Sequence, residues 1–233
     1  MQDFESLTSN PETFSEIGNK TKEFVGPTEI CNFEGCELIN NEQLANYLSE
    51  TIPPSHLEGC PGIEFDPNNP QFTECPGTLG FYECGSHAIH VAGEGCFPNG
   101  AEGMKDTVTH EIGHNAYAGI VENNPELAAK WEALNTESWQ KLLTDGTGFV
   151  SDYATTNKYE DFAESYRTYV CDPEKLQILS PEKYAFMHDQ VFAGREYQPT
   201  VLAYWSYDSA GNKIEVTSTG VYDLSGNRIA WSL

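Results

Sequence analysis

The segment His110-Glu111-Ile112-Gly113-His114 constrains the fold of this chain more than any other feature. Histidines four positions apart lie about 40° from each other around an α-helix, so their imidazoles meet only if the segment is helical. Two imidazoles at this spacing bind one metal ion, and the intervening glutamate can take a proton from a metal-activated water. The alternative is an ordinary helix with two solvated histidines. Gly113 is interpreted as leaving room for a cleft.

A second predicted helix, at about 158 to 170, carries two carboxylates one turn apart, Glu160 and Glu164. Its other side is apolar and consists of Phe162, Tyr166 and Tyr169. A catalytic zinc ion needs three protein ligands, and a carboxylate helix facing the histidine helix is what a third ligand requires. Glu164 either accepts a hydrogen bond from a ligand imidazole, or it caps the helix or forms an ion pair, for which Arg167 is the candidate partner.

Three further segments make the pattern specific. The histidine segment is followed by SDYATTN at 151–157, EDFAE at 160–164 and FMHDQ at 186–190. Together they resemble the catalytic domain of anthrax lethal factor and the related secreted Pro-Pro endopeptidases, which are zinc peptidases of the gluzincin class. The resemblance covers roughly 110–192. The cysteine-rich part before it departs from the family's pattern, so a substrate preference is not carried over.

The resemblance implies a role for each of five residues. His110, His114 and Glu160 would bind one Zn²⁺ per chain, Glu111 would be the general base, and Tyr153 would stabilise the oxyanion. The chemistry of these groups agrees, because two neutral imidazoles and one carboxylate leave the ion with a net positive charge that acidifies water. A phenol O–H near the ion would stabilise the negative charge that develops on the substrate carbonyl. Packing is the alternative role for Tyr153.

Charge and hydropathy restrict the partners. The chain has 36 acidic and 12 basic residues and a net charge of −24, which repels nucleic acid and anionic lipid. No apolar run approaches the roughly 18 to 20 residues that a membrane span needs. We therefore expect a protein or peptide substrate, no nucleic-acid partner and no membrane span. The sequence does not indicate an oligomeric state.

The cysteines indicate the compartment. Six of the seven lie between positions 31 and 96, among many glycines and prolines, which predicts disulfide bonds and a secreted, extracellular protein. A structural zinc knot is the alternative, although the chain lacks paired Cys-x-x-Cys motifs. Seven is odd, so one thiol is expected to stay unpaired, and Cys171 is the candidate. The first residues are acidic and unlike a signal peptide, so we interpret the chain as a mature form with an added initiator Met.

The order of these features predicts an α+β fold, a two-lobed zincin-like metallopeptidase domain with a small C-terminal β-hairpin appendage. Residues 1–24 are interpreted as an N-terminal segment, either an amphipathic helix or a pro-segment remnant. The catalytic domain is expected at 25–199. It would consist of a cysteine-rich N-terminal lobe at 25–104 and a helical C-terminal lobe at 105–199. Residues 200–233 would form the appendage.

Individual elements are predicted from periodicity and from turn and cap residues. We expect a helix near 41–51, a strand pair at 78–83 and 87–92, and Asp106 as the cap of the histidine helix. Further helices are expected at 125–143, 158–170 and 181–192.

The tail is predicted to consist of strands at 201–205, 214–217 and 229–231. In this region YDSAGNKI at 207–214 recurs fifteen positions later as YDLSGNRI at 222–229, which indicates consecutive β-hairpins with Gly-Asn turns.

Histidines outside the motif are expected to have other roles. His87 and His90 lie three apart on a predicted strand and so point to opposite faces, which argues against a shared metal ion. That strand is expected at the sheet edge, where it would pair with an extended peptide above the zinc. His56 and His188 are expected to be ordinary core or surface histidines.

The sequence thus predicts a secreted zinc-dependent metalloendopeptidase with a glutamate general base. One alternative is a non-catalytic, zinc-containing surface-binding protein that uses the C-terminal β repeats. Another is a zinc hydrolase that acts on a non-peptide ester or amide.

Overall fold

The computed structural model describes residues 23–196 and four strand segments beyond them, at 204–207, 213–217, 220–222 and 228–230. It contains helices and a small sheet, which confirms the α+β class. Residues 1–22, which are nearly all of the N-terminal segment predicted at 1–24, lie outside the described residues. None of the helices in the described ranges has the length and apolar character needed to cross a membrane.

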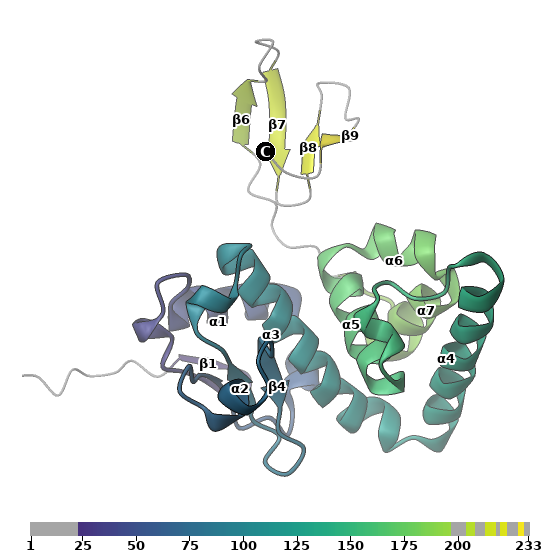
Figure 1. Ribbon diagram of the computed structural model, residues 1–233, viewed down its shortest axis with the longest axis horizontal. Coiled ribbons are helices and arrows are strands. Elements are labelled where there is room, and N and C mark those ends of the chain that lie inside the picture. The colour runs from purple at the N-terminus through teal and green to yellow at the C-terminus, as the bar shows by residue number, and fades with distance from the viewer. Residues whose placement is uncertain (1–22, 197–203, 208–212, 218–219, 223–227, 231–233) are drawn as a thin grey trace, which may run out of the picture.

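The first part of the described chain forms a five-stranded sheet (Figure 1). Its strands lie in the order β1 (Glu23–Val25), β2 (Thr28–Cys31), β3 (Gly62–Phe65), β5 (Ile89–Val91) and β4 (Gly80–Tyr82). The three central strands are parallel, while β1 and β4 pair antiparallel at the two edges. The predicted strand pair is confirmed in β4 and β5, which run antiparallel. The expectation that the strand containing His90 is the edge was wrong, because β5 has neighbours on both sides and β4 is the edge.

Alternating side chains explain the position of this sheet. Ile30, Ile63 and Ile89 point to one face and are buried, whereas intervening residues are partly exposed.

The helix α3 (Gly100–Ala116) packs against β4 and β5. It continues without a break into a π-helical segment, η4 (Tyr117–Glu122). Because α3 begins at Gly100, the prediction that Asp106 caps it was wrong: Asp106 lies inside the helix.

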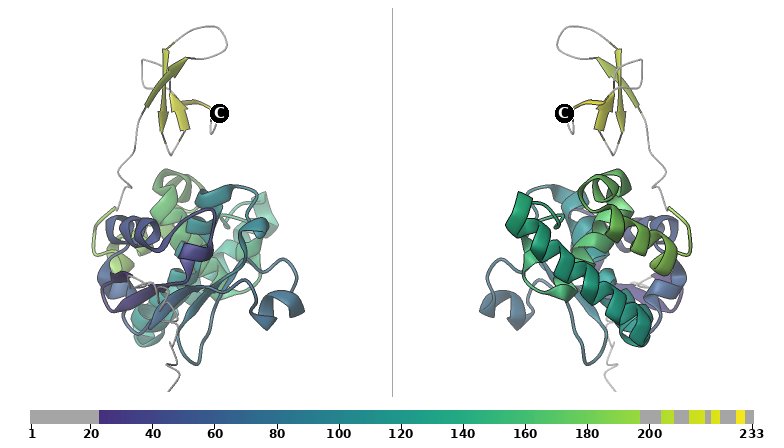
Figure 2. Two further views of the ribbon diagram at one scale, coloured as in Figure 1. Left: turned by 90° about the vertical axis from the view of Figure 1, so that its left-hand side faces the viewer. Right: turned by 90° about the vertical axis from the view of Figure 1, so that its right-hand side faces the viewer.

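The helices that follow α3 in the chain gather on one side of the molecule, away from the sheet, and lie in front in the right-hand view of Figure 2. They are α4 (Pro125–Asp145), α5 (Lys158–Cys171), α6 (Pro173–Leu179) and α7 (Pro181–Phe186), which continues as the π-helical η6 (Met187–Val191). The predicted helices at 125–143 and 158–170 are confirmed. The helix expected at 181–192 is present with a change of helical type.

The shorter elements complete the fold. The predicted helix α1 (Asn41–Thr51) is confirmed and begins with a capping box between Asn40 and Gln43. The other short helical segments are η1 (Phe33–Gly35), η2 (Pro54–Leu57), α2 (Pro70–Glu74), η3 (Glu94–Cys96) and η5 (Tyr153–Thr155).

The tail forms a second, antiparallel sheet in the order β6 (Tyr204–Tyr207), β7 (Lys213–Thr217), β8 (Gly220–Tyr222) and β9 (Arg228–Ala230). The two predicted Gly-Asn turns lie outside the described residues.

The cysteines differ from the prediction. All seven lie in the described part of the chain, and no disulfide joins any of them there. Cys36 instead lies 3.8 Å from the sulfur of Met104, and the buried Cys60 thiol faces the carbonyl oxygen of Gly62 at 3.4 Å. Cys171 lies 3.9 Å from the hydroxyl of Tyr47. The expected disulfide framework is therefore not formed in this structure.

Candidate metal centre

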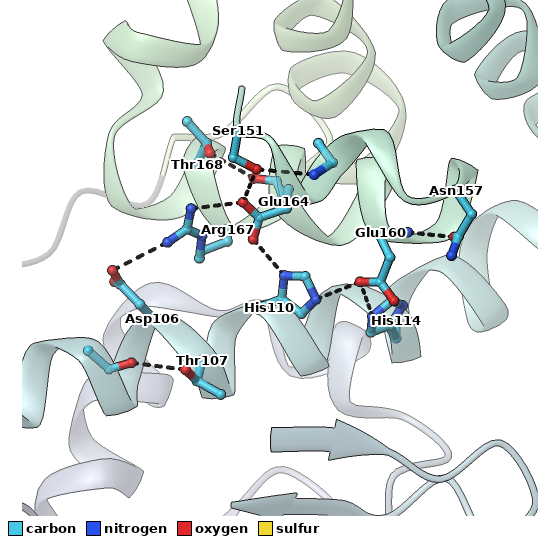
Figure 3. Close-up of polar contacts among 12 residues, drawn as sticks. Asp106, Thr107, His110, His114, Ser151, Asn157, Glu160, Glu164, Arg167 and Thr168 are labelled. Carbon is cyan, nitrogen blue, oxygen red and sulfur yellow. Dashed lines mark hydrogen bonds and ion pairs between the residues drawn. The ribbon is translucent and has the colours of Figure 1, made fainter. Parts of the chain in front are cut away.

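The helices α3 and α5 bring the predicted ligands together (Figure 3). His110 Nε2 lies 3.0 Å from Glu160 Oε2, and His114 Nε2 lies 3.3 Å from the same oxygen. The two imidazole centroids are 5.0 Å apart, as expected for histidines one helical turn apart. One carboxylate oxygen of α5 thus faces both imidazoles of α3.

A glycine allows these helices to come this close. A Cβ atom at Gly113 would lie only 2.9 Å from the Cα of Ala163 and 3.2 Å from the Cβ of Tyr166. Backbone atoms cannot move aside as a flexible side chain can, so a larger residue would push α5 away. The interpretation that Gly113 makes room for the cleft was therefore wrong: it makes room for the helix that carries Glu160.

The start of α5 is fixed by its cap. The side chain of Asn157 accepts hydrogen bonds from the backbone N–H groups of Tyr159, at 2.8 Å, and Glu160, at 3.0 Å. These bonds satisfy donors that the first helical turn leaves without partners. Asn157 thereby sets the backbone position from which Glu160 reaches the histidines.

Glu164 orients the first histidine. Its Oε1 lies 2.9 Å from His110 Nδ1, while its Oε2 accepts from Ser151 Oγ at 2.5 Å and from Arg167 Nη2 at 3.1 Å. The contact with a ligand imidazole and the ion pair with Arg167, which were alternatives in the sequence, are therefore both present. With Nδ1 bound to a carboxylate, the Nε2 atom of His110 is directed to Glu160.

Two members of this network were not predicted from the sequence. Ser151 donates to Glu164, and Asp106 lies 3.6 Å from Arg167 Nη1 (Figure 3). Asp106 stands one helical turn before His110 and therefore on the same face of α3. That spacing was the available signal for its role. Nothing in the sequence around Ser151 marks it as a partner of Glu164.

The distances fit the coordination of a zinc ion. Ligands about 2.0 to 2.1 Å from a tetrahedral Zn²⁺ lie roughly 3.3 Å from one another. The separations of 3.0 and 3.3 Å between Glu160 and the two histidines are close to this value. Donor atoms of His110, Glu111 and His114 also lie within 4.8 Å of one another. Two imidazoles and a carboxylate are the donor set of several catalytic zinc sites, so His110, His114 and Glu160 fit a zinc ion.

In the ligand residues, burial and hydrogen bonds shift the pKa in opposite directions. Burial lowers the pKa of His110, but the bonds to Glu160 and Glu164 outweigh it and hold that pKa at about 9. Burial raises the pKa of Glu160, but the hydrogen bonds with His110 and His114 lower it by more, so that its pKa is about 2. Glu164 behaves likewise, with burial opposed by His110, Arg167 and Ser151 and a pKa of about 2. Both carboxylates are thus ionised at neutral pH.

Glu111 lies beside the ligands and is almost fully buried. It is 6% exposed, and burial raises its pKa above the ordinary value. A Cβ atom at Gly80 of β4 would approach Glu111 Cγ to 3.2 Å, so the edge strand lies directly against this side chain. A carboxylate with a raised pKa is better suited to exchange protons near neutral pH.

Tyr153 lies at the open side of the centre. Its ring centroid is 5.8 Å from that of His110, and 56% of the residue is exposed. Partial burial of the hydroxyl and the nearby Glu160 carboxylate raise the pKa of Tyr153 to about 12. The phenol consequently keeps its proton at neutral pH and can serve as a hydrogen-bond donor.

A cleft of about 620 Å³ opens onto these residues. His110, Glu111, Tyr153, Glu164 and Arg167 line it together with Gly80 of the edge strand β4. The structure therefore gathers every predicted site residue within or beside one surface cleft.

No protein-family model matches the sequence, and no curated protein matches it.

The remaining histidines behave differently. His56 is buried and bonds Tyr166 Oη at 2.7 Å and the carbonyl oxygen of Val191 at 3.0 Å, and burial lowers its pKa to about 4. His188 contacts Asp189 near the surface. Both are ordinary histidines, as predicted.

Proposed function

We propose that this chain is a zinc-dependent metalloendopeptidase of the gluzincin class, with one Zn²⁺ held by His110, His114 and Glu160. The convergence of Glu160 Oε2 on both imidazole Nε2 atoms carries the proposal. When bound, zinc supplies a Lewis acid that acidifies water and polarises a carbonyl group.

The protein's own residues would perform the proton transfers. Glu111 accepts a proton from the attacking water and returns it to the leaving amine, a double role for which its raised pKa suits it. The Tyr153 hydroxyl donates a hydrogen bond to the oxyanion that develops on the carbonyl oxygen. Glu164 holds the ring of His110 in one orientation through Nδ1.

The edge strand β4 offers a place for the substrate. It is the last strand of the sheet, its residue Gly80 lines the cleft, and an edge strand can pair with an extended peptide through backbone hydrogen bonds. A peptide bound in this way would pass Glu111, which packs against Gly80 of the same strand. This arrangement favours a peptide over a small ester or amide.

The same proposal extends to the organisation of the chain. We infer that the sheet-containing part and the helical part are the two lobes of a zincin-like domain, with the cleft between them. The boundary expected between 104 and 105 falls inside α3, which begins at Gly100. Residues 200–233 would be an appendage, because β6 to β9 pair only with one another among the described strands. Secretion stays a prediction.

The deciding experiment compares two glutamate variants. Glu111→Gln should retain about one zinc ion in the centre. It should cleave an unstructured protein at least about 10²-fold more slowly than the wild type. Glu160→Gln should lose the zinc ion of this centre, because a neutral amide is a poorer ligand. Glu126→Gln, an exposed residue of α4, is the matched control.

Zinc content by mass spectrometry and peptide products are the two readouts. Cleavage that persists after complete removal of metal would contradict the proposal. Full activity in both variants would show that the assigned roles are wrong.

A further inference from the structure

The face of the sheet opposite α3 carries a second group of metal-binding side chains, Glu64, Asp66 and His90. Their donor atoms all lie within 4.8 Å of one another. Glu64 of β3 stands directly opposite His90 of β5 in the sheet register, and Asp66 follows two positions after Glu64. Side chains two apart on a strand share a face, so the three converge.

The group is separate from the centre on α3. Gly80 of β4 pairs with Val91 and faces Thr107 and Glu111 of α3. The next residue of β5 toward the N-terminus, His90, therefore points to the other side of the sheet. An ion bound there would share no ligand with His110 and His114.

The ring of His90 presents an unsatisfied nitrogen to the two carboxylates. Nδ1 lies 3.3 Å from Asp66 Oδ2 and 3.9 Å from Glu64 Oε2. Nevertheless this buried atom has no hydrogen-bond partner in the described part of the chain. A ring nitrogen that faces two carboxylates needs either a proton or a metal ion between them, and a buried polar atom without a hydrogen-bond partner is uncommon in folded proteins.

The three side chains are also held in place by their neighbours. The ring of Phe81 stacks on His90, with centroids 4.8 Å apart and planes 18° from parallel. Asn32 Nδ2 donates to Glu64 Oε1 at 2.7 Å, and Asn69 Nδ2 donates to Asp66 Oδ2 at 2.8 Å. Such supporting hydrogen bonds orient the ligands of metal sites and reduce the cost of binding.

We propose that Glu64, Asp66 and His90 form a second metal site that takes a divalent transition-metal ion, with Zn²⁺ as the first candidate. An imidazole nitrogen favours such an ion over Mg²⁺ or Ca²⁺, which prefer oxygen ligands alone. Two carboxylates neutralise its charge. Glu64 and Asp66 are 40% and 30% exposed, which gives the ion an entry path and water ligands.

This ion would connect two parts of the sheet. It would fasten β3 to β5, and β5 pairs with the edge strand β4 that borders the cleft. The site is therefore structural in character, and it does not depend on the proposed peptidase activity.

Zinc stoichiometry on the full chain tests the proposal. The protein is stripped with a chelator and dialysed against Zn²⁺, and bound metal is measured by mass spectrometry. The wild type should bind two equivalents, and the isosteric double variant Glu64→Gln/Asp66→Asn should bind one. Glu42→Gln/Glu50→Gln, which removes two exposed carboxylates of α1, is the charge-matched control and should still bind two.

A third variant separates this site from the centre on α3. His114→Ala should lose the other equivalent and keep the one bound by His90. If the wild type binds a single ion that Glu64→Gln/Asp66→Asn removes and His114→Ala retains, the second site stands and the proposed peptidase centre fails.

Two results would overturn the proposal. One is a double variant that binds as much zinc as the wild type. The other is a wild type whose only equivalent is lost in His114→Ala. Circular dichroism monitors folding, and His90→Asn provides an independent variant should the double variant unfold. The same loss of one equivalent is expected in His90→Asn.

Discussion

Glu164 shows how a residue outside the ligand set can govern a metal centre. It holds the Nδ1 atom of His110, and it is itself held by Ser151 and Arg167. The ring of His110 is thereby fixed before any ion binds, which lowers the entropic cost of coordination.

Replacing this carboxylate should weaken zinc binding without removing a ligand. We expect Glu164→Gln to lower the affinity for zinc by about 10- to 100-fold, because the amide loses the charge that favours the hydrogen bond with the imidazole. Competition with a chromophoric chelator measures the affinity, with Glu126→Gln as control. An unchanged affinity would assign Glu164 to stability alone.

Tyr153 allows a separate test of oxyanion stabilisation. Tyr153→Phe removes only the hydroxyl, so kcat should fall by about 10² to 10³ while KM changes little. Zinc content must be measured in parallel, because the hydroxyl also lies near Glu160. Equal kcat values for the variant and the wild type would leave Tyr153 with packing as its only role.

The residues of the site differ in how well the sequence predicted them. The two histidines follow from helical spacing, whereas Glu160 and Tyr153 were assigned by the likeness of their segments to a known family. Ser151 was not predicted as a partner of Glu164, since only the fold brings the loop before η5 against α5. A contact between distant segments leaves no periodic signal in the sequence.

At the scale of elements, the centre depends on the close contact between α3 and α5. Gly113 lies where these helices meet, opposite the backbone of Ala163. The helix that carries both ligand histidines thus contains a residue of poor helix propensity between them, and this residue permits the close approach of α5.

Gly113→Ala should therefore destabilise the protein although alanine favours helices. The new methyl group would meet backbone only 2.9 Å away, and overpacking of this kind costs about 1 to 3 kcal/mol. Gly119→Ala, in the π-helical η4 with nothing within 4 Å, is the matched control and should not lower the Tm. A Tm for Gly113→Ala equal to that of the control would contradict the close packing.

Long elements were easier to predict than short ones. The helices α4 and α5 have asparagine caps, at Asn124 and Asn157, and clear periodicity. The start of α3 was missed because Gly100 and Gly103 weaken the helical pattern of its first turns. β1, β2 and β3 have only three or four residues each, too few for an alternating pattern to stand out.

The predicted disulfide bonds are not formed in this structure, and the sequence alone could not have settled the question. Closely spaced cysteines in a loop-rich segment are typical of disulfide-bonded secreted proteins, but their spacing in the sequence does not give the distances between sulfur atoms in the fold. In the folded chain Cys36 packs against Met104 instead of a second cysteine. Composition alone therefore could not decide between a disulfide-bonded form of this fold and a form with free thiols.

For the whole molecule, metal binding, folding and pH are linked through His110. The hydrogen bonds with Glu160 and Glu164 raise its pKa from 6.5 to about 9 in the folded protein. Because the folded pKa is the higher one, this network stabilises the metal-free protein fully below about pH 6.5. The contribution is lost as pH rises through about 9.

The affinity for zinc depends on pH in the opposite direction. It binds the neutral imidazole, so below about pH 9 it must displace the proton held by His110, and its affinity should rise about tenfold per pH unit toward that value. The Tm difference between zinc-loaded and chelated protein should therefore widen between about pH 6.5 and 9, as the metal-free form weakens and the zinc complex tightens. Differential scanning calorimetry at constant free zinc measures it, and Glu160→Gln should show little widening. A difference that stays constant over this range would mean that zinc does not compete with the His110 proton, and that its ligands lie elsewhere.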